Sequence, residues 1–233
     1  MRAIRFLTED DYPPMNFALA DGTLTGFNVE IARAICEELE IGCTIQARRW
    51  DTLIDSLESG KGDAVVASIA GTPGVRAHVD FSAPYYQTPA RFMARKGASP
   101  PEPTPSALSG KTIGTVAGSS HEAYLKAFFP DVKIKPYDSG ASLQTALRNG
   151  EIDAAFGDGL TFAVWLSGEA SAGCCAFLGG PYTESRFFGE GVGIAVRTDD
   201  VVLRKALNWA LWRLEAKGKY AEIYLKYFPM SFY

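Results

Sequence analysis

Two stretches of the chain, LIDSLESGKGDAVVAS at 53–68 and LQTALRNGEIDAAFGD at 143–158, align without a gap at a spacing of 90 residues. They share two leucines, a glycine, an aspartate and an alanine in register. Each predicts a helix that stops at the glycine, followed by an Asp-led apolar strand. Many α/β proteins reuse this unit, so chance similarity is one explanation. Two similar α/β lobes explain the shared register better.

The segments around the first copy extend the α/β pattern. Strands are predicted at 4–7 and 43–47, and 64–69 is a continuous apolar run typical of a buried parallel strand. Between the first two strands, Ile31 and Ile35 fall on one face of a helix, with Asn28 as its expected N-cap. The Pro- and Ser-rich segment at 96–111 predicts a surface loop, and 201–227 predicts a helical tail broken at Gly218.

Composition limits the class of protein. The chain has 233 residues, a net charge of -4 and 47% hydrophobic residues, which suits one large domain or two lobes. Its mild acidity argues against a nucleic-acid partner. We find no apolar run long enough to span a membrane and no signal peptide, so we expect a cytoplasmic chain or a mature form without its leader.

Four cysteines are present, without the spacing of a zinc site. Cys36 and Cys43 lie at the end of a predicted helix and the start of the next strand, close enough to form a disulfide. Two unreactive buried thiols are the alternative. Cys174 and Cys175 are adjacent in the chain, and adjacent cysteines rarely form a disulfide with each other. We predict no metal site and no cofactor.

Ligands in open α/β sheets bind beyond the carboxyl ends of the strands. The repeat places Ser68 and Asp158 at such ends, one in each lobe. Asp158 suits a ligand cation, although a turn or capping role explains it as well.

Other candidate residues lie in loops or at a helix start. Gly118-Ser119-Ser120 offers N–H and hydroxyl donors to an anion, and ordinary N-capping by Ser119 explains the motif equally well. Tyr12 and Trp50 could stack on a ligand or pack in the core. Glu9 begins an acidic loop that is either solvated or selective for a cation.

Catalytic motifs are scarce. The chain has no nucleophile elbow, P-loop or His-Glu-x-x-His motif. His121 lies next to Ser119 and Ser120, but neighbours at a helix start seldom have the geometry of a nucleophile and base. Arg76 follows a Thr-Pro-Gly turn, at an expected helix start, and is either a solvated charge or a ligand for an anionic group.

Six segments occur in an order that strongly resembles the family 3 extracellular solute-binding proteins, the polar amino-acid receptors of ABC importers. They are YPPMNFALADGTLTGFNVEIARAI, RWDTLIDSLESGKGDAVVAS, TPGVRAHVDFSAPYY, GKTIGTVAGSSHEAYL, NGEIDAAFGD and GEGVGIAVR, and the resemblance spans about 4–229. It implies the type II periplasmic-binding-protein fold, two α/β lobes joined by a two-strand hinge. The expected lobes are 1–87 plus 184–233, and 88–183. The resemblance to receptors for lysine, arginine, ornithine and histidine also implies a Cys36–Cys43 disulfide and a monomer exported to the periplasm, or lipid-anchored in a Gram-positive cell.

The resemblance also implies roles for particular residues. Glu9 would hold the ligand's basic side chain, between aromatic walls, and Asp158 would pair with its α-ammonium. Backbone and hydroxyl groups at a strand end and a helix start would bind the amino and carboxylate groups. The residues concerned are Glu9, Tyr12, Trp50, Ser68, Ala70, Ser119, Ser120 and Asp158.

The sequence departs from the family pattern at the carboxylate clamp. The clamping arginine aligns with Val75, so Arg76 comes one residue late, a rotation of about 100° on a helix. Ala70 also lacks the usual hydroxyl. Because Pro73-Gly74 can remodel the helix start, we predict that Arg76 still reaches the ligand.

These patterns predict the soluble receptor of an ABC importer, which closes around a polar, cationic amino acid or a derivative and then meets a membrane permease. An alternative is a dehydratase on the same fold, resembling cyclohexadienyl or arogenate dehydratases, with Glu9 or Asp158 as general acid. Another is the ligand-sensing domain of a receptor kinase, whose gene would continue into a membrane helix. The terminal FPMSFY shows no such start.

Overall fold

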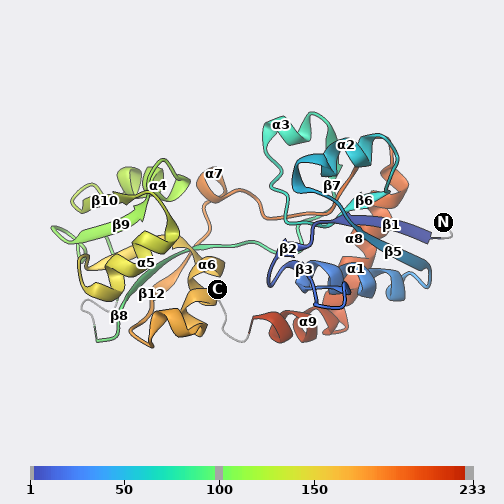
Figure 1. Ribbon diagram of the computed structural model, residues 1–233. Helices are drawn as coiled ribbons and strands as arrows, with labels where there is room; N and C mark the ends of the chain where they lie inside the picture. The colour runs from blue at the N-terminus through green and yellow to red at the C-terminus, as the bar shows by residue number, and fades with distance from the viewer. Residues whose placement is uncertain (1–2, 98–101, 229–233) are drawn as a thin grey trace. The chain divides into compact units, whose positions relative to one another are not determined.

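The structure is a computed structural model that describes residues 3–97 and 102–228. The described chain divides into two compact units (Figure 1). Unit 1 comprises residues 3–87 and 190–228, and unit 2 comprises residues 88–97 and 102–189. Residues 184–189, which the sequence assigned to the first lobe, group with unit 2 because they pack against its helices and hydrogen-bond to Tyr124.

Unit 1 is built on a five-stranded sheet in the order β5-β1-β6-β13-β7. β1 pairs in parallel with β5 and β6, whereas β13 is antiparallel to both β6 and β7. A small antiparallel sheet, β2-β3-β4, follows β1. The strands are β1 Ala3–Thr8, β2 Asp11–Tyr12, β3 Asn16–Ala18, β4 Leu24–Thr25, β5 Gly42–Ala47, β6 Ala64–Val65, β7 Val79–Phe81 and β13 Ala195–Arg197.

Helices cover both faces of this sheet. α2 lies over β1, β6 and β13, where Leu53 and Leu57 pack on Leu7 and Val65. α1 packs against β1 and β5 and is itself in contact with α8 and α9, on the other side of the strands from α2 (Figure 1). The helices of unit 1 are α1 Phe27–Glu38, the 3-10 turn η1 Trp50–Thr52, α2 Leu53–Glu58, α3 Pro73–Arg76, α8 Val201–Ala216 and α9 Lys219–Tyr227.

Unit 2 has a five-stranded sheet in the order β10-β9-β11-β8-β12. β9 is parallel to β10 and β11, and β8 runs antiparallel between β11 and β12. Its elements are β8 Ala90–Arg95, β9 Thr112–Val116, α4 Ser120–Phe128, β10 Lys133–Tyr137, α5 Gly140–Asn149, β11 Ala154–Asp158, α6 Gly159–Ser167, the 3-10 turn η2 Glu169–Ser171, β12 Cys175–Tyr182 and α7 Ser185–Phe188.

Alternating side chains of β8 and β11 make two cores, one on each face of the unit 2 sheet. Phe92 and Phe156 face α4, while Met93 and Ala155 face α5 and α6. The apolar strands read from the sequence are therefore buried on both faces, as a central position in an α/β sheet requires.

The repeated segments occupy equivalent places, which confirms the predicted repeat. α2–β6 is the first copy and α5–β11 is the second, and each strand lies parallel to the first parallel strand of its unit. β6 ends at Val65, earlier than predicted. Ser68 has a φ of 62°, in the left-handed region, so the chain turns away from the sheet soon after Val65.

The expected loop at 96–111 contains neither helix nor strand in its described part, and residues 98–101 lie outside the described residues. The predicted N-cap of α1 is wrong, because the helix begins at Phe27 after Gly26. Gly26 has a φ of 118°, and a Cβ there would come within 2.5 Å of the Met15 carbonyl oxygen. Glycine is therefore required at this cap, and Asn28 moves inside the first helical turn.

The Cys36–Cys43 disulfide is present and joins the end of α1 to β5, as predicted. A second disulfide joins the adjacent Cys174 and Cys175. Adjacent cysteines rarely bridge, and the sequence left the state of this pair open. The pair lies where η2 turns into the edge strand β12, and the positive φ angles of Ala172 and Gly173 make the tight turn before it.

We therefore expect the denatured but unreduced protein to contain no titratable thiol. After reduction and alkylation its mass should rise by four labels, because all four cysteines then react. Replacing Cys36 and Cys43 with serine should leave the thiol count of the unreduced chain at zero. Two reactive thiols in that double variant would show that Cys174 and Cys175 are not joined.

Candidate ligand-binding site

In unit 1, three neighbouring strands end side by side at one edge of the sheet. The register pairs Thr8 of β1 with Ala47 of β5, and Leu7 with Val65 of β6. The chain therefore continues into Glu9 after β1, into Trp50 after β5 and into Ser68 after β6. The carboxyl edge thus brings three of the predicted site residues to one end of unit 1.

A buried asparagine connects this edge to the core. Asn28 is fully buried, and its Nδ2 donates to the Asn16 Oδ1 at 2.6 Å and to the Ser68 Oγ at 2.9 Å. Its Oδ1 accepts from the Tyr85 hydroxyl at 2.5 Å. Burial raises the pKa of Tyr85 well above its ordinary value, so the phenol stays protonated and can donate this bond.

Asn16 extends the same network to Glu9. Its Nδ2 lies 3.2 Å from the Glu9 carbonyl oxygen and 3.3 Å from the Glu9 Oε1. The hydrogen bonds thus fix both the backbone and the carboxylate of Glu9 relative to Ser68. The sequence did not identify Asn16 and Tyr85 as site residues, and it placed Asn28 at an N-cap. Asn28 lies on the same helical face as Ile31 and Ile35, and this position indicates a buried polar side chain.

The aromatic candidates are on the surface of unit 1. Tyr12 is 45% exposed and Trp50 is 53% exposed, so the interpretation that they pack in the core is wrong. Ala70 is exposed as well, whereas Ser68 is half-buried by its bond to Asn28. Large exposed aromatic side chains beside a strand edge are suited to contact a ligand.

Arg76 ends the short helix α3 instead of starting a helix as predicted. Its Nε donates to the Gly71 carbonyl oxygen at 2.9 Å, and its guanidinium carbon lies 5.0 Å from the centre of the Phe81 ring. Val75 packs on the core beneath α2. The two neighbours therefore have distinct positions, with Val75 directed inward and Arg76 exposed.

The Arg76 side chain is anchored but not neutralised. Within residues 3–97 and 102–228, no ion pair involves it. An exposed guanidinium held by a carbonyl and an aromatic ring, without a carboxylate, is prepared for an external anion.

In unit 2, the parallel strands β9 and β11 deliver the remaining candidates to one edge of the sheet. Ser119 is the N-cap of α4, and its Oγ accepts from the Glu122 N–H at 3.2 Å and donates to the Val116 carbonyl at 2.7 Å. Glu122 in turn pairs with Lys126 and accepts from the Gly118 N–H, and both contacts lower the pKa of its carboxyl. The capping role of Ser119 is therefore confirmed, and Ser120 is the exposed first residue of the helix.

Asp158 is the N-cap of α6. Its Oδ1 accepts from both the backbone N–H and the hydroxyl of Thr161, at 2.7 and 2.8 Å. Within the described residues no hydrogen bond to its Oδ2 is found. The two interpretations of Asp158 are thus compatible, because one oxygen caps the helix and the other can receive a ligand cation.

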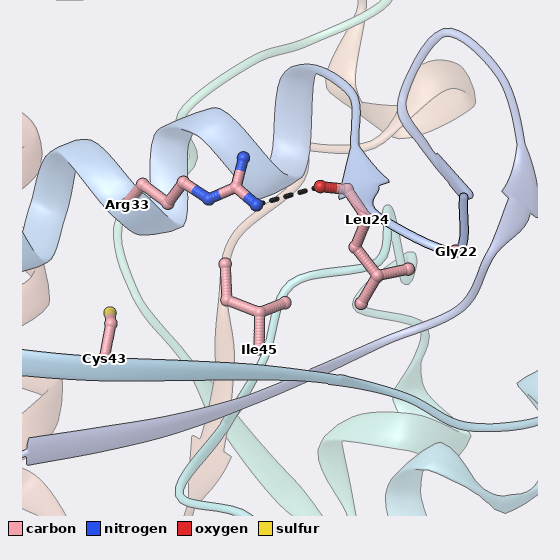
Figure 2. Close-up of a pocket in the computed structure, with 5 residues that line it drawn as sticks. All are labelled: Gly22, Leu24, Arg33, Cys43 and Ile45. Carbon is pink, nitrogen blue, oxygen red and sulfur yellow. Dashed lines mark hydrogen bonds between the residues drawn. The ribbon is translucent and has the colours of Figure 1, made fainter. Parts of the chain in front are cut away.

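Other features of the described chain lie apart from these residues. A pocket of about 320 Å³ between α1, β5 and the β3–β4 hairpin is lined by Gly22, Leu24, Arg33, Cys43 and Ile45, none of them a predicted ligand residue. Its arginine is engaged by the Leu24 carbonyl (Figure 2). The described residues contain no group of three potential metal ligands, and no described helix is long and apolar enough to cross a membrane.

Comparison with known proteins defines the class to which this fold and these strand-edge residues belong. The L-arginine-binding protein of Pseudomonas aeruginosa is 37% identical over 235 residues, covering 100% of this chain and 90% of that protein. The arginine-specific periplasmic binding protein of Salmonella typhimurium has a TM-score of 0.60 at 33% identity and covers 98% of this chain and 100% of its own. The L-cystine receptor of Neisseria gonorrhoeae, at 23% identity, shares the fold with a TM-score of 0.85 over 97% of this chain and 92% of its own.

These similarities define a ligand-binding receptor with the type II periplasmic-binding-protein fold. The model of the bacterial extracellular solute-binding proteins, family 3, matches residues 4–230, and the chain belongs to this family. The predicted fold and the predicted receptor class are confirmed, and the chain is a solute-binding protein and not an enzyme.

Proposed function

We propose that this receptor captures a cationic amino acid such as arginine, lysine or ornithine and presents it to the permease of an ABC importer. The main support is the carboxylate of Asp158, which has one oxygen committed to a helix cap and a second without a partner among the described residues. Glu9, held by Asn16, supplies a second carboxylate for the ligand's basic side chain. Two carboxylates suit a ligand with two positive groups.

The proposal assigns the ligand to residues of both units. Glu9, Tyr12, Trp50, Ser68, Ala70 and Arg76 would contribute from unit 1, and Ser119, Ser120 and Asp158 from unit 2. A ligand that contacts both units favours a closed arrangement only through those contacts. Closure would then report occupancy to the permease, with a single receptor molecule in the periplasm, or lipid-anchored in a Gram-positive cell, and a leader removed on export.

A thermal-shift screen tests this function after the protein has been unfolded and refolded to remove any co-purified ligand. At 100 times its Kd, a specific ligand should stabilise the protein by about 2.7 kcal/mol, or raise Tm by about 5–10 °C. We expect arginine, lysine or ornithine to do so and glutamate to have no effect. Opines, betaines and polyamines complete the screen, and if no cationic amino acid raises Tm, the proposal is wrong.

Arg76 is proposed to bind the α-carboxylate of the ligand, because its guanidinium is anchored without a carboxylate partner. Arginine and agmatine, which lacks the carboxylate, separate this role from general binding. The native protein should prefer arginine, and the Arg76→Ala variant should lose about 2 kcal/mol of that preference, about thirtyfold in Kd. The exposed Arg49, which pairs with Asp51, provides a control as Arg49→Ala. If Arg76→Ala leaves the ratio of the Kd values for arginine and agmatine unchanged, Arg76 does not bind the carboxylate and is a solvated surface charge.

A further inference from the structure

The Cys174–Cys175 disulfide lies in unit 2, apart from the proposed ligand residues. Cys175 is the first residue of β12 and is 5% exposed, in the core that faces α5 and α6, whereas Cys174 is half-buried in the turn after η2. In the β8–β12 ladder Cys175 pairs with Arg95, the last residue of β8. Ala90, at the other end of β8, pairs with Asp158. The bridge and Asp158 therefore lie at opposite ends of the same strand.

A bridge between adjacent residues closes almost no loop. Cys36 and Cys43 are seven residues apart in the sequence, whereas Cys174 and Cys175 are neighbours. In the chain-entropy account, the stabilisation from a disulfide grows with the length of the loop that it closes. The fold therefore gains less from the Cys174–Cys175 bridge, and unit 2 can stay folded when this bridge opens.

One cation faces the buried half of the bridge. Residues directly opposite in an antiparallel pair have Cβ atoms about 4.5–5.5 Å apart on one face of the sheet, so Arg95 and Cys175 are neighbours. The Arg95 Nη1 donates to the Leu147 carbonyl oxygen at 3.4 Å, in the last turn of α5. A carbonyl holds this guanidinium in place and leaves its positive charge intact.

A second cation lies over the turn that leads into the bridge. The Lys96 backbone N–H donates to the Cys174 carbonyl oxygen at 2.9 Å. The Lys96 Nζ lies 4.0 Å from the position that a Cβ on Gly173 would occupy. The side chain of Lys96 is therefore next to the residue that precedes the half-buried Cys174.

Positive charge exceeds negative charge around the bridge. Within residues 3–97 and 102–228, neither Arg95 nor Lys96 forms an ion pair. Arg148 on α5 adds a third cation, which donates to the Ala170 carbonyl oxygen of η2, and Glu169 is the acidic residue of η2. An anion that approaches this end of unit 2 is therefore attracted to it.

We infer that the Cys174–Cys175 bridge is a modification site, at which an anionic external thiol exchanges with the protein disulfide. The external thiolate attacks the Sγ of Cys174, the more exposed residue of the pair. The S–S bond breaks, and its electron pair leaves with the Sγ of Cys175 as a thiolate beside Arg95. Neighbouring cations stabilise a thiolate, so this environment favours the leaving group.

A second external thiolate completes the reaction. It attacks the external sulfur of the mixed disulfide and releases Cys174 as a thiolate, while the two external sulfurs become joined. Two thiols have then supplied two electrons to the protein disulfide. The protons that the external thiols lost return to the Cys174 and Cys175 thiolates, so the exchange needs no other reactant.

The test compares three small thiols that differ in charge: mercaptoethanesulfonate, 2-mercaptoethanol and cysteamine, which carry a sulfonate, a hydroxyl and an ammonium group. The folded native protein reacts with each thiol at low ionic strength, and iodoacetamide traps the opened cysteines at timed intervals. Mass spectrometry of the peptides assigns the label to Cys174 and Cys175. Rates are divided by the thiolate concentration, since the three thiols ionise to different extents.

We expect the bridge to open in the folded protein, fastest with mercaptoethanesulfonate and slowest with cysteamine. The rates should differ by about fivefold between successive thiols, as expected for one unit charge near a cation in water. In about 1 M salt, where the Debye length is about 3 Å, the differences should become small.

Variants assign the effect to the two flanking cations. Arg95→Gln keeps a donor for the Leu147 carbonyl, and both Arg95→Gln and Lys96→Gln should reduce the ratio of the mercaptoethanesulfonate and cysteamine rates by about fivefold. Lys133→Gln is the control, because it removes an exposed cation from β10, the opposite edge strand of the same sheet. Its rate ratio should equal that of the native protein.

Three results would overturn the inference. In the first, the Cys174–Cys175 bridge stays closed in the folded protein with every thiol. In the second, the three thiols react at equal rates at low ionic strength. In the third, Arg95→Gln and Lys96→Gln keep the native rate ratio, or Lys133→Gln reduces it as much as they do. Thermal unfolding of each variant without thiol checks that all of them are folded during the reaction.

Discussion

The Asp158→Asn variant should fold as the native protein does yet bind a cationic amino acid about 100-fold more weakly or worse. Asparagine caps helices as well as aspartate, so its side-chain oxygen can still accept from Thr161. The variant removes only the negative charge proposed to meet the ligand's ammonium. Truncating one partner of a hydrogen-bonded charge pair costs about 2–5 kcal/mol of binding free energy.

Calorimetry with arginine measures this loss, and thermal unfolding without ligand measures the cap. Asp158→Ala should show the same weak binding together with a loss of about 1 kcal/mol in stability, because it also removes the acceptor for Thr161. Asp200, which caps α8 through the Leu203 N–H, gives a control as Asp200→Asn, with native binding expected. If Asp158→Asn binds arginine with near-native affinity, Asp158 serves only as a helix cap.

Asn28→Ala should be the most destabilising single substitution among the site-supporting residues of unit 1. It leaves the Asn16 Oδ1, the Ser68 Oγ and the buried Tyr85 hydroxyl without their shared partner. Each buried polar group left without a partner costs about 1–3 kcal/mol, so we expect a loss of at least about 3 kcal/mol.

Urea unfolding of the ligand-free protein measures this free energy. Asn149→Ala is a suitable control, because Asn149 is exposed at the end of α5 and makes one long bond to Glu151. The Asn149→Ala substitution should change the free energy of unfolding by no more than about 0.5 kcal/mol. A loss below about 1 kcal/mol for Asn28→Ala would show that water replaces the network without penalty.

The sequence predicts the elements whose signals are local. The two repeat copies give the equivalent strands β6 and β11, and the spacing near Cys36 and Cys43 agrees with the disulfide that the family resemblance implied. Asp158 is the last residue of β11 as predicted, whereas Ser68 lies beyond β6, which ends at Val65.

Features that depend on distant partners are not visible in the local pattern. Asn28 resembles an N-cap until Gly26 is seen to approach Met15, and its true partners include Ser68 and Tyr85, which are far away in the chain. The insertion of β13 between β6 and β7 is equally non-local. The Cys174–Cys175 bridge depends on a turn through Ala172 and Gly173 that composition alone does not specify.

The position of β13 also affects how a newly made chain can fold. The described residues of unit 2, 88–97 and 102–189, all precede β13 in the chain, so they are synthesised before the last strand of unit 1. β7 has β13 as its partner in the sheet, and α8 and α9 cover α1, so unit 1 cannot close until these C-terminal segments arrive. Until then β6 presents an unpaired edge to other nascent chains, a state that favours aggregation. The sheet of unit 1 is therefore the one that is completed last as the chain is made.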